Sequence, residues 1–488
     1  MKKIILFFLC FFILGLYVNK IYAEDDLDLL NSLDTELQEE NINKDENLLN
    51  ELDLDQKKEK DKECIFKVLA KNLSGDFRIR LEHFWRKPDK RKGIDRQSDI
   101  GSLLLNFASY YVLNNFRFDF SGWLEGGNQK DTYAGVSEYF QDRDRRRRYA
   151  ELNEIYLTYS ASDYDLTVGK KIFKNGISTL YSPVDRHSPK DGNDPMDTQD
   201  YGLWQLKLDY YVENDSITFA ILPVFQTSKS PSEYSRWTGS VVEDDKQVDS
   251  DFYTLDVDKN NTRIENEYPD VDLENIAYFA KVKGTRAGWD LFFSTYQGLN
   301  PYYVLKEEHR NGKIYYIKKN VFIGEYAGGF STTYKKWEFH GEALYNHSYN
   351  SKDDNYVSYV LGLTYTIDDL LQSLKLKKMI ITIEYGGEFV TQKQSAKGYI
   401  KSSQEMRPGR NDIFSFVRLE ITDNWNLEYT SNFELSKGGR INRLISEYKF
   451  KSGLKWKAGV EFFNGGKHSY YGRWRKNDRI FTELIYPF

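Results

Sequence analysis

The sequence predicts an all-β protein, a transmembrane antiparallel up-and-down β-barrel of about 18 strands with a short acidic N-terminal arm. Three features predict this fold: a secretory leader, apolar residues that alternate with polar ones along most of the chain, and connections that are alternately short and long. Strands can cross a bilayer only when the sheet closes and every backbone group is paired. The expected parts are a signal peptide at 1–23, the arm at 24–72 and the barrel at 73–488.

The leader has the parts of a secretory signal peptide. Two lysines precede an apolar run over residues 4–18, and Ala23 offers a small residue before Glu24. The run is short for a transmembrane helix of about 20 residues, so we expect cleavage after Ala23. A retained helical anchor is the alternative.

The arm carries the acidity of the chain. Residues 24–63 hold sixteen acidic residues against five lysines, and two leucine clusters lie at 27–37 and 48–54. This composition predicts a disordered, solvated periplasmic spacer. Alternatively, the leucines form short helices on a partner, which would make periplasmic export proteins candidate partners. Only Cys64 remains after the leader, so an internal disulfide is excluded, and no nucleic-acid partner is expected.

Period-2 alternation predicts the strands. Phe77, Ile79 and Leu81 alternate with Arg78 and Arg80, so one side of this strand is apolar and faces lipid. The expected strands lie near residues 74–86, 101–113, 115–126, 149–160, 163–173, 201–213, 215–227, 274–284, 288–304, 315–334, 337–349, 355–367, 379–391, 412–422, 425–437, 440–452, 454–464 and 479–488.

The connections distinguish this barrel from a soluble sandwich, which also alternates. Most even-numbered connections are tight turns, such as NN at 114–115 and KK at 335–336, whereas most odd-numbered ones are long; the even-numbered DDLLQSLKLKKM at 368–379 is the long exception. Short periplasmic turns and long outer loops are typical of outer-membrane barrels. The long connections expected outside are 87–100, 127–148, 174–200, 228–273 and 392–411.

The last strand has apolar residues on one face and mostly polar residues on the other. Ile480, Leu484, Tyr486 and Phe488 share one side, so we expect a closing strand that pairs with the first. An unpaired edge strand is the alternative. The terminal Phe488 resembles the signal that barrel-assembly machinery recognises, which makes that machinery an expected partner.

The side chains of opposite parity should line the lumen. The candidate solute pathway consists of Arg78, Arg80, Arg117, Lys171, Lys207, Lys281, Arg418, Arg443, Lys455 and Lys457 with the acidic Glu154 and Asp209. Such charges need a wet or paired environment. Two interpretations remain open: an ion-pair lattice that stiffens the barrel, or a basic lining that attracts anions.

Two loops carry further candidates. Arg145, Arg146, Arg147 and Arg148 would concentrate anions at the pore mouth, unless they contact lipopolysaccharide phosphates or are simply solvated. In the acidic loop 228–273, a calcium-loop spacing is formed by Asp256, Asp258, Asn260 and Glu267. Calcium is the one cofactor candidate, and a solvated acidic loop is the alternative.

The stretch EIYLTY…DLTVGKK…SP resembles the aromatic strand, tight turn and basic strand of Gram-negative porin-like proteins. The alginate-export type is most similar in size, strand number and charged lumen. The resemblance implies passage of an anionic polymer or small anion. Such families usually carry Arg where Lys170 stands, and parity places Lys170 outward unless a bulge intervenes.

The function expected is a passive outer-membrane channel for anionic solutes or an acidic exopolysaccharide, in contact with lipid and lipopolysaccharide. The alternatives are a general or substrate-specific porin, or a structural or adhesion barrel. An enzyme is not expected, because none of the six histidines belongs to a nucleophile motif. An energised receptor would need a plug domain and about 22 strands.

Overall fold

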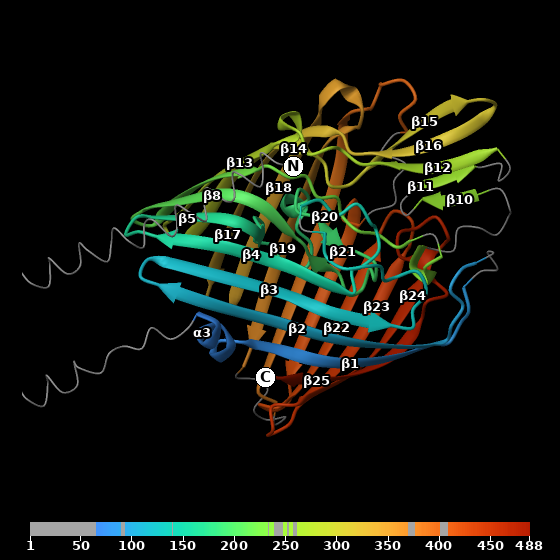
Figure 1. Ribbon diagram of the computed structural model, residues 1–488. Helices are drawn as coiled ribbons and strands as arrows, with labels where there is room; N and C mark the ends of the chain where they lie inside the picture. Colours follow the sequence, from blue (N-terminus) through green and yellow to red (C-terminus); the bar gives the residue numbers. More distant parts are fainter. Residues whose placement is uncertain are drawn as a thin grey trace, which may run out of the picture. The chain divides into compact units, whose positions relative to one another are not determined.

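The computed structural model describes residues 65–88, 93–138, 140–232, 234–238, 247–250, 253–256, 261–368, 376–400 and 408–488. They belong to one compact unit, Ile65–Phe488. Eighteen strands form one closed antiparallel sheet (Figure 1). Within the described ranges, no helix combines the length and the apolar character needed to cross a membrane.

The barrel strands are β1 (Ser74–Phe84), β2 (Asp99–Leu113), β3 (Phe116–Gly127), β4 (Ala150–Ser160), β5 (Tyr164–Ile172), β8 (Gly202–Val212), β9 (Asp215–Leu222), β13 (Ala277–Arg286), β14 (Trp289–Leu299), β17 (Phe322–Tyr334), β18 (Trp337–Ser348), β19 (Asn355–Ile367), β20 (Lys378–Gln392), β21 (Asn411–Glu420), β22 (Trp425–Glu434), β23 (Arg440–Lys449), β24 (Lys455–Asn464) and β25 (Arg479–Pro487). Short strands in the connections are β6 (Lys190–Asp191), β7 (Gln199–Asp200), β10 (Gln247–Ser250), β11 (Tyr253–Asp256), β12 (Thr262–Glu267), β15 (Val304–Arg310) and β16 (Lys313–Lys319). The helices are α3 (Ile65–Lys71), η1 (Pro183–Asp185), η2 (Arg236–Thr238), η3 (Leu273–Asn275), η4 (Tyr349–Ser351) and η7 (Gly472–Trp474).

The last strand closes the barrel against the first, as the sequence predicts. β1 and β25 pair antiparallel, with Ile79 opposite Leu484. The backbone groups of Gly75 and Phe488 exchange two hydrogen bonds of 3.1 Å. The chain end is therefore paired, and the edge-strand alternative is wrong.

The alternation of short and long connections is confirmed. The β2–β3 turn consists of Asn114 and Asn115, and the β17–β18 turn of Lys335 and Lys336. Asn114 and Lys335 adopt positive φ, at 50° and 56°, as tight hairpin turns require. The connections at the other end of the strands are mostly longer and carry the additional strands.

One pair of strands ends earlier than predicted. The sequence places strands at 288–304 and 315–334, but β14 ends at Leu299 and β17 begins at Phe322. The intervening residues form the hairpin β15–β16, which joins β12 in a separate three-stranded sheet. Alternation continues through both parts, so a period-2 pattern cannot show where the barrel strand ends.

The two faces of the barrel have opposite chemistry. The outward positions carry exposed apolar side chains, such as Leu103 at 52% and Phe293 at 58% exposed, while buried charged residues lie on the inner face. Trp289, Trp337 and Trp425 each begin a strand directly after a short turn and are exposed. Tryptophans gathered at one level of an apolar outer surface are typical of a membrane interface.

Candidate functional site: the lumen and its inserted loop

The connection between β5 and β8, residues 173–201, folds into the barrel. We call it the inserted loop. Its first half contacts the inner faces of β14, β17, β18 and β20, and its second half contacts β1, β23 and β25 on the other side. It therefore crosses the lumen.

Two buried carboxylates hold the first half of the inserted loop. Oε2 of Glu342 accepts the backbone N–H groups of Ile177 (2.9 Å) and Ser178 (3.3 Å). Glu384 accepts those of the next three residues, 179–181, at 2.9–3.0 Å, and its Oε1 also lies 3.0 Å from Nε2 of His340. A carboxylate that accepts several backbone N–H groups is well compensated for its burial.

Side chains reinforce this anchorage. The ring of Tyr181 stacks on that of Phe414 in β21, with centroids 5.1 Å apart. Nδ1 of His187 lies 3.1 Å from Oε2 of Glu325 in β17. These contacts fix the side-chain positions of the loop as well as its backbone.

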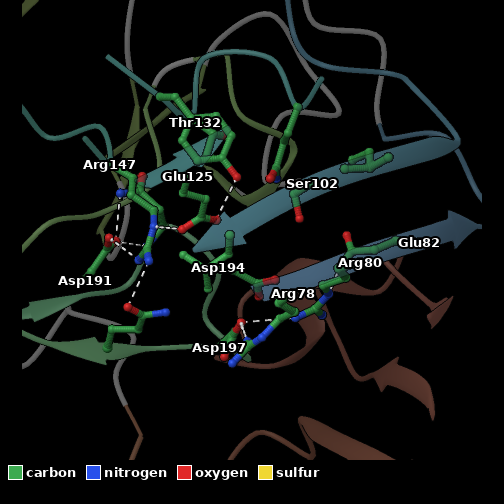
Figure 2. A pocket seen from close by; sticks show the side chains of 16 residues that line it. Arg78, Arg80, Glu82, Ser102, Glu125, Thr132, Arg147, Asp191, Asp194 and Asp197 are labelled. Atoms are coloured by element: carbon green, nitrogen blue, oxygen red, sulfur yellow. Dashed lines mark hydrogen bonds and ion pairs between the residues drawn. The ribbon is translucent and has the colours of Figure 1, made fainter. Parts of the chain in front are cut away.

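Arginines of the barrel wall bind the second half of the inserted loop (Figure 2). Nη1 of Arg80 lies 3.1 Å from Oδ2 of Asp197. Nη1 of Arg479, which is 0% exposed, lies 2.7 Å from Oδ2 of Asp194, and its Nε lies 2.7 Å from Oε2 of Glu461. Arg443 pairs with Glu461 as well. Charges of both signs thus alternate around this junction.

The structure corrects the predicted cluster of four arginines at the pore mouth. Arg147 and Arg148 are buried. Arg147 pairs with Glu125 (2.5 Å) and with Asp191 (2.9 Å), as Figure 2 shows. Arg148 pairs with Asp142 at 2.5 Å. The partners of Arg147 lie outside the run, whereas Asp142 belongs to it; a charge count within the run shows neither which residues pair nor that the pairs are buried.

Asp142 connects two outer loops. Its carboxylate accepts hydrogen bonds from Arg148 and from the ammonium of Lys229 (2.6 Å). Burial alone would raise the pKa of Asp142, but these two cations outweigh it and lower the pKa below its ordinary value. Arg146 pairs with Asp144, and the ring of Tyr303 lies 4.8 Å from the guanidinium carbon of Arg145.

Most predicted pathway residues lie in ion pairs on the inner face. The pairs are Arg78 and Arg80 with Asp197, Arg117 with Asp119, Lys207 with Asp209, Arg418 with Glu428, Arg443 with Glu461, and Lys457 with Glu447. Glu154 accepts hydrogen bonds from Ser121 and from the backbone of Ile172, and Lys455 occupies an inward register position on β24, opposite Ile485. This pattern matches the first of the two interpretations of the lumen, an ion-pair lattice that stiffens the barrel.

A second pattern lies on the wall formed by β5, β8, β9 and β13. Within the described residues, Lys171, Lys281 and Lys283 make no ion pair with a carboxylate. Nζ of Lys171 lies 4.2 Å from the ring centroid of Tyr156, and Nζ of Lys281 donates to the backbone oxygen of Asn175 at 2.8 Å. With Lys207, these residues form a group that we call the lysine wall.

Lys170 is buried rather than lipid-facing. Its Nζ lies 2.7 Å from Oε1 of Glu151 and 3.0 Å from the backbone oxygen of Leu152. The pairing of β3 with β4 shifts register beside this site, and Gly169 has φ 134°. The printed pairings of β5 itself show no register shift, so the irregularity lies in the neighbouring β3–β4 pairing and in the backbone of Gly169, and the outward position that parity predicts for Lys170 is wrong.

Two cavities adjoin the inserted loop. The larger, of about 330 Å³, lies between the inserted loop and the outer loops. Its lining includes Tyr302, Tyr470 and Trp474 with the cationic Arg186 and Lys190. The smaller, of about 60 Å³, lies among Arg78, Arg80 and the aspartates of the inserted loop (Figure 2).

The predicted calcium loop is only partly described. Asp258 and Asn260 lie outside the described residues, as does the side chain of Asp256. Glu267 pairs with Lys319 at 2.7 Å. In the part of the chain that the structure describes, no group of three His, Cys, Asp or Glu side chains could hold a metal ion.

Inspection of the sequence missed the inserted loop. Parity places Glu342 and Glu384 on the inner face, but their backbone partners lie in residues 177–181, more than 160 positions away. No local pattern distinguishes a loop that turns into the barrel from one that extends outward.

No protein-family model and no curated protein matches this sequence. Solved structures with similar arrangement include a mutant of the Rh. blastica porin, with 10% identity, a TM-score of 0.38, and coverage of 85% of this chain and 99% of that chain. Pseudomonas aeruginosa OpdQ shows 13% identity and a TM-score of 0.39 over 86% and 98% of the two chains. A loop-deletion variant of OmpT, an outer membrane protein of Vibrio cholerae, shows 11% identity and a TM-score of 0.35 over 85% and 98%. These low values identify neither a solute nor a partner.

Proposed function

We propose that this protein is a passive diffusion channel in the outer membrane of a Gram-negative bacterium. The observation that carries the proposal is the inserted loop, held across the lumen by Glu342 and Glu384 on one side and by Arg80 and Arg479 on the other. A fixed loop narrows a wet lumen to a width at which side chains can discriminate among solutes. A purely structural barrel has no need of such a constriction.

The solute class proposed is small and polar, with a preference for anions. The lysine wall supports this preference, because Lys171, Lys281 and Lys283 have positive charges that no described carboxylate pairs with. The arginines support it less, since most of them are neutralised by partners. We therefore expect the selectivity to be modest.

An acidic polymer is the second candidate, and the lysine wall favours it too. A polymer chain would have to pass the inserted loop, whose hydrogen bonds would need to open. A small anion needs no such rearrangement. Small solutes are therefore the stronger proposal.

Reconstitution of the protein in a planar bilayer tests both the channel function and the anion preference. Under a salt gradient, we expect stepwise conductance with a reversal potential on the anion side. Absence of conductance would contradict the channel function. Conductance without ion preference would retain the channel but reject the anion preference. In liposomes, swelling by monosaccharides but not by an acidic oligosaccharide would separate small solutes from a polymer.

A further inference from the structure

The short helix α3 lies outside the barrel wall. Figure 1 shows it beside the end at which β2 turns into β3. Oγ of Ser109 in β2 donates to the backbone oxygen of Leu69 at 2.7 Å, and Nδ2 of Asn72 donates to the backbone oxygen of Tyr110 at 3.0 Å. Ser109 has the parity of Leu103, which is exposed on the lipid-facing side, yet Ser109 itself is buried. The helix therefore covers part of the outward face.

The helix presents three distinct faces. Val68 and Leu69 are half-buried against the barrel. Phe66 and Ala70 lie four residues apart on an exposed face, and Phe66 is 75% exposed; Leu73, two residues after the helix ends, is exposed as well. An exposed phenylalanine on a helix this short has no partner within the described chain that would shield it from water.

The third face is cationic. Lys67 and Lys71 lie one turn apart, and both are exposed. A helix with an apolar face, basic residues beside it and a third face docked on protein has the chemistry of an interfacial membrane helix. Basic residues at such a position meet the phosphates of lipid headgroups.

We propose that α3 is an interfacial anchor, with Phe66 and Leu73 inserted at the headgroup boundary of the periplasmic leaflet and Lys67 and Lys71 bound to lipid phosphates. The helix docks through Ser109 on the outward face of β2, on which Leu103 and Leu113 are exposed apolar side chains, and this favours lipid over a separate protein partner. The bond from Ser109 satisfies a carbonyl at the C-terminal end of the helix, a group that no water would satisfy in an apolar layer.

Site-directed spin labelling tests this position. In a form of the full chain with Cys10→Ser and Cys64→Ser, we label Phe66→Cys, Leu73→Cys and Lys67→Cys singly in vesicles of phosphatidylethanolamine and phosphatidylglycerol. Collisions with oxygen report lipid, and collisions with a water-soluble nickel chelate report water. The matched control is Leu273→Cys, because Leu273 is 81% exposed but lies on an outer loop.

We expect the labels at 66 and 73 to favour oxygen at least threefold more than the labels at 67 and 273. If position 66 is as open to the nickel chelate as position 273, the anchor does not exist. If position 66 is shielded from both reagents, a protein segment covers it and the lipid proposal is wrong. Channel conductance of the same variants is expected to be unchanged, so this test is independent of the proposed function.

Discussion

The carboxylate of Glu384 accepts the backbone N–H of Tyr181 at 2.9 Å, although the two residues lie 203 positions apart in the chain. Glu384 is fully buried and also accepts the N–H groups of the two preceding residues. One side chain of the barrel wall thus orders three consecutive residues of the inserted loop. This contact fixes the position of the inserted loop against the barrel wall.

Replacement of Glu384 should therefore loosen the inserted loop. In Glu384→Gln, an amide NH₂ faces backbone donors, at a cost of about 1–3 kcal/mol for the unsatisfied groups. We expect larger and noisier single-channel conductance in planar bilayers. Glu338→Gln is the control, because the side chain of Glu338 is half-exposed and, among the described residues, makes only a long contact of 3.9 Å to His340. Equal conductance traces for the two variants would contradict the proposed role.

Arg479 should be a determinant of barrel stability. Its removal leaves Asp194 without its one cation among the described residues and leaves Glu461 with Arg443 alone; breaking a buried pair typically costs about 3–5 kcal/mol. We expect Arg479→Met to unfold at clearly lower denaturant concentration in detergent micelles. Arg286→Met, which breaks an exposed pair with Asp215, should leave the midpoint nearly unchanged. Similar midpoints for the two variants would show that the buried network contributes little.

The lysine wall should set the anion preference. The triple variant Lys171→Gln, Lys281→Gln and Lys283→Gln removes its charges that have no carboxylate partner in the described chain. We expect the anion-to-cation permeability ratio to fall by a factor of about 3 to 10. Lys313→Gln on the outer hairpin serves as the control. A ratio that stays constant in the triple variant would exclude the lysine wall as the source of selectivity.

The ion pairs of Asp142 with Arg148 and Lys229 should remain intact at mildly acidic pH. Its pKa is lowered in the folded protein, so its stabilising contribution is present above the unfolded value of about 3.9 and is lost only as the pH falls through the lower folded value. Wild type should melt above Asp142→Asn by a constant margin from pH 7 to pH 5. The margin should shrink below pH 4. A margin that has vanished at pH 5 would contradict the ion pairs seen here.

Gly169 should tolerate no side chain. A Cβ there would lie 2.3 Å from the backbone oxygen of Ile155 and 2.6 Å from Cα of Tyr156, at φ 134°. Backbone atoms of a paired strand cannot move aside, so we expect Gly169→Ala to reduce the yield of folded barrel severalfold. Gly466→Ala, where a Cβ meets nothing within 4 Å, should fold normally. Comparable folded yields on a gel that separates folded from unfolded barrels would refute this.

The sequence predicted the strands well because each strand separates lipid from a polar interior. Phe77 and Arg78 are adjacent but must face opposite environments, so apolar and polar residues alternate along the strand. The prediction of strand ends from alternation failed at residues 300–321, because the alternation continues there into an outer hairpin. The sequence also assigned Arg147 and Arg148 to a solvated mouth, whereas both are buried with Glu125 and Asp142.

By itself, the sequence determined the number of strands, their direction and the closing role of the chain end at Phe488, because these follow from a local two-residue period and from turn length. Only the tertiary structure decided that residues 173–201 cross the lumen and which charges are neutralised there. Those features depend on pairs such as Tyr181 with Glu384 and Asp194 with Arg479, whose members are hundreds of residues apart. A local period has no information about such pairs, because the closure of the barrel is what brings their members together.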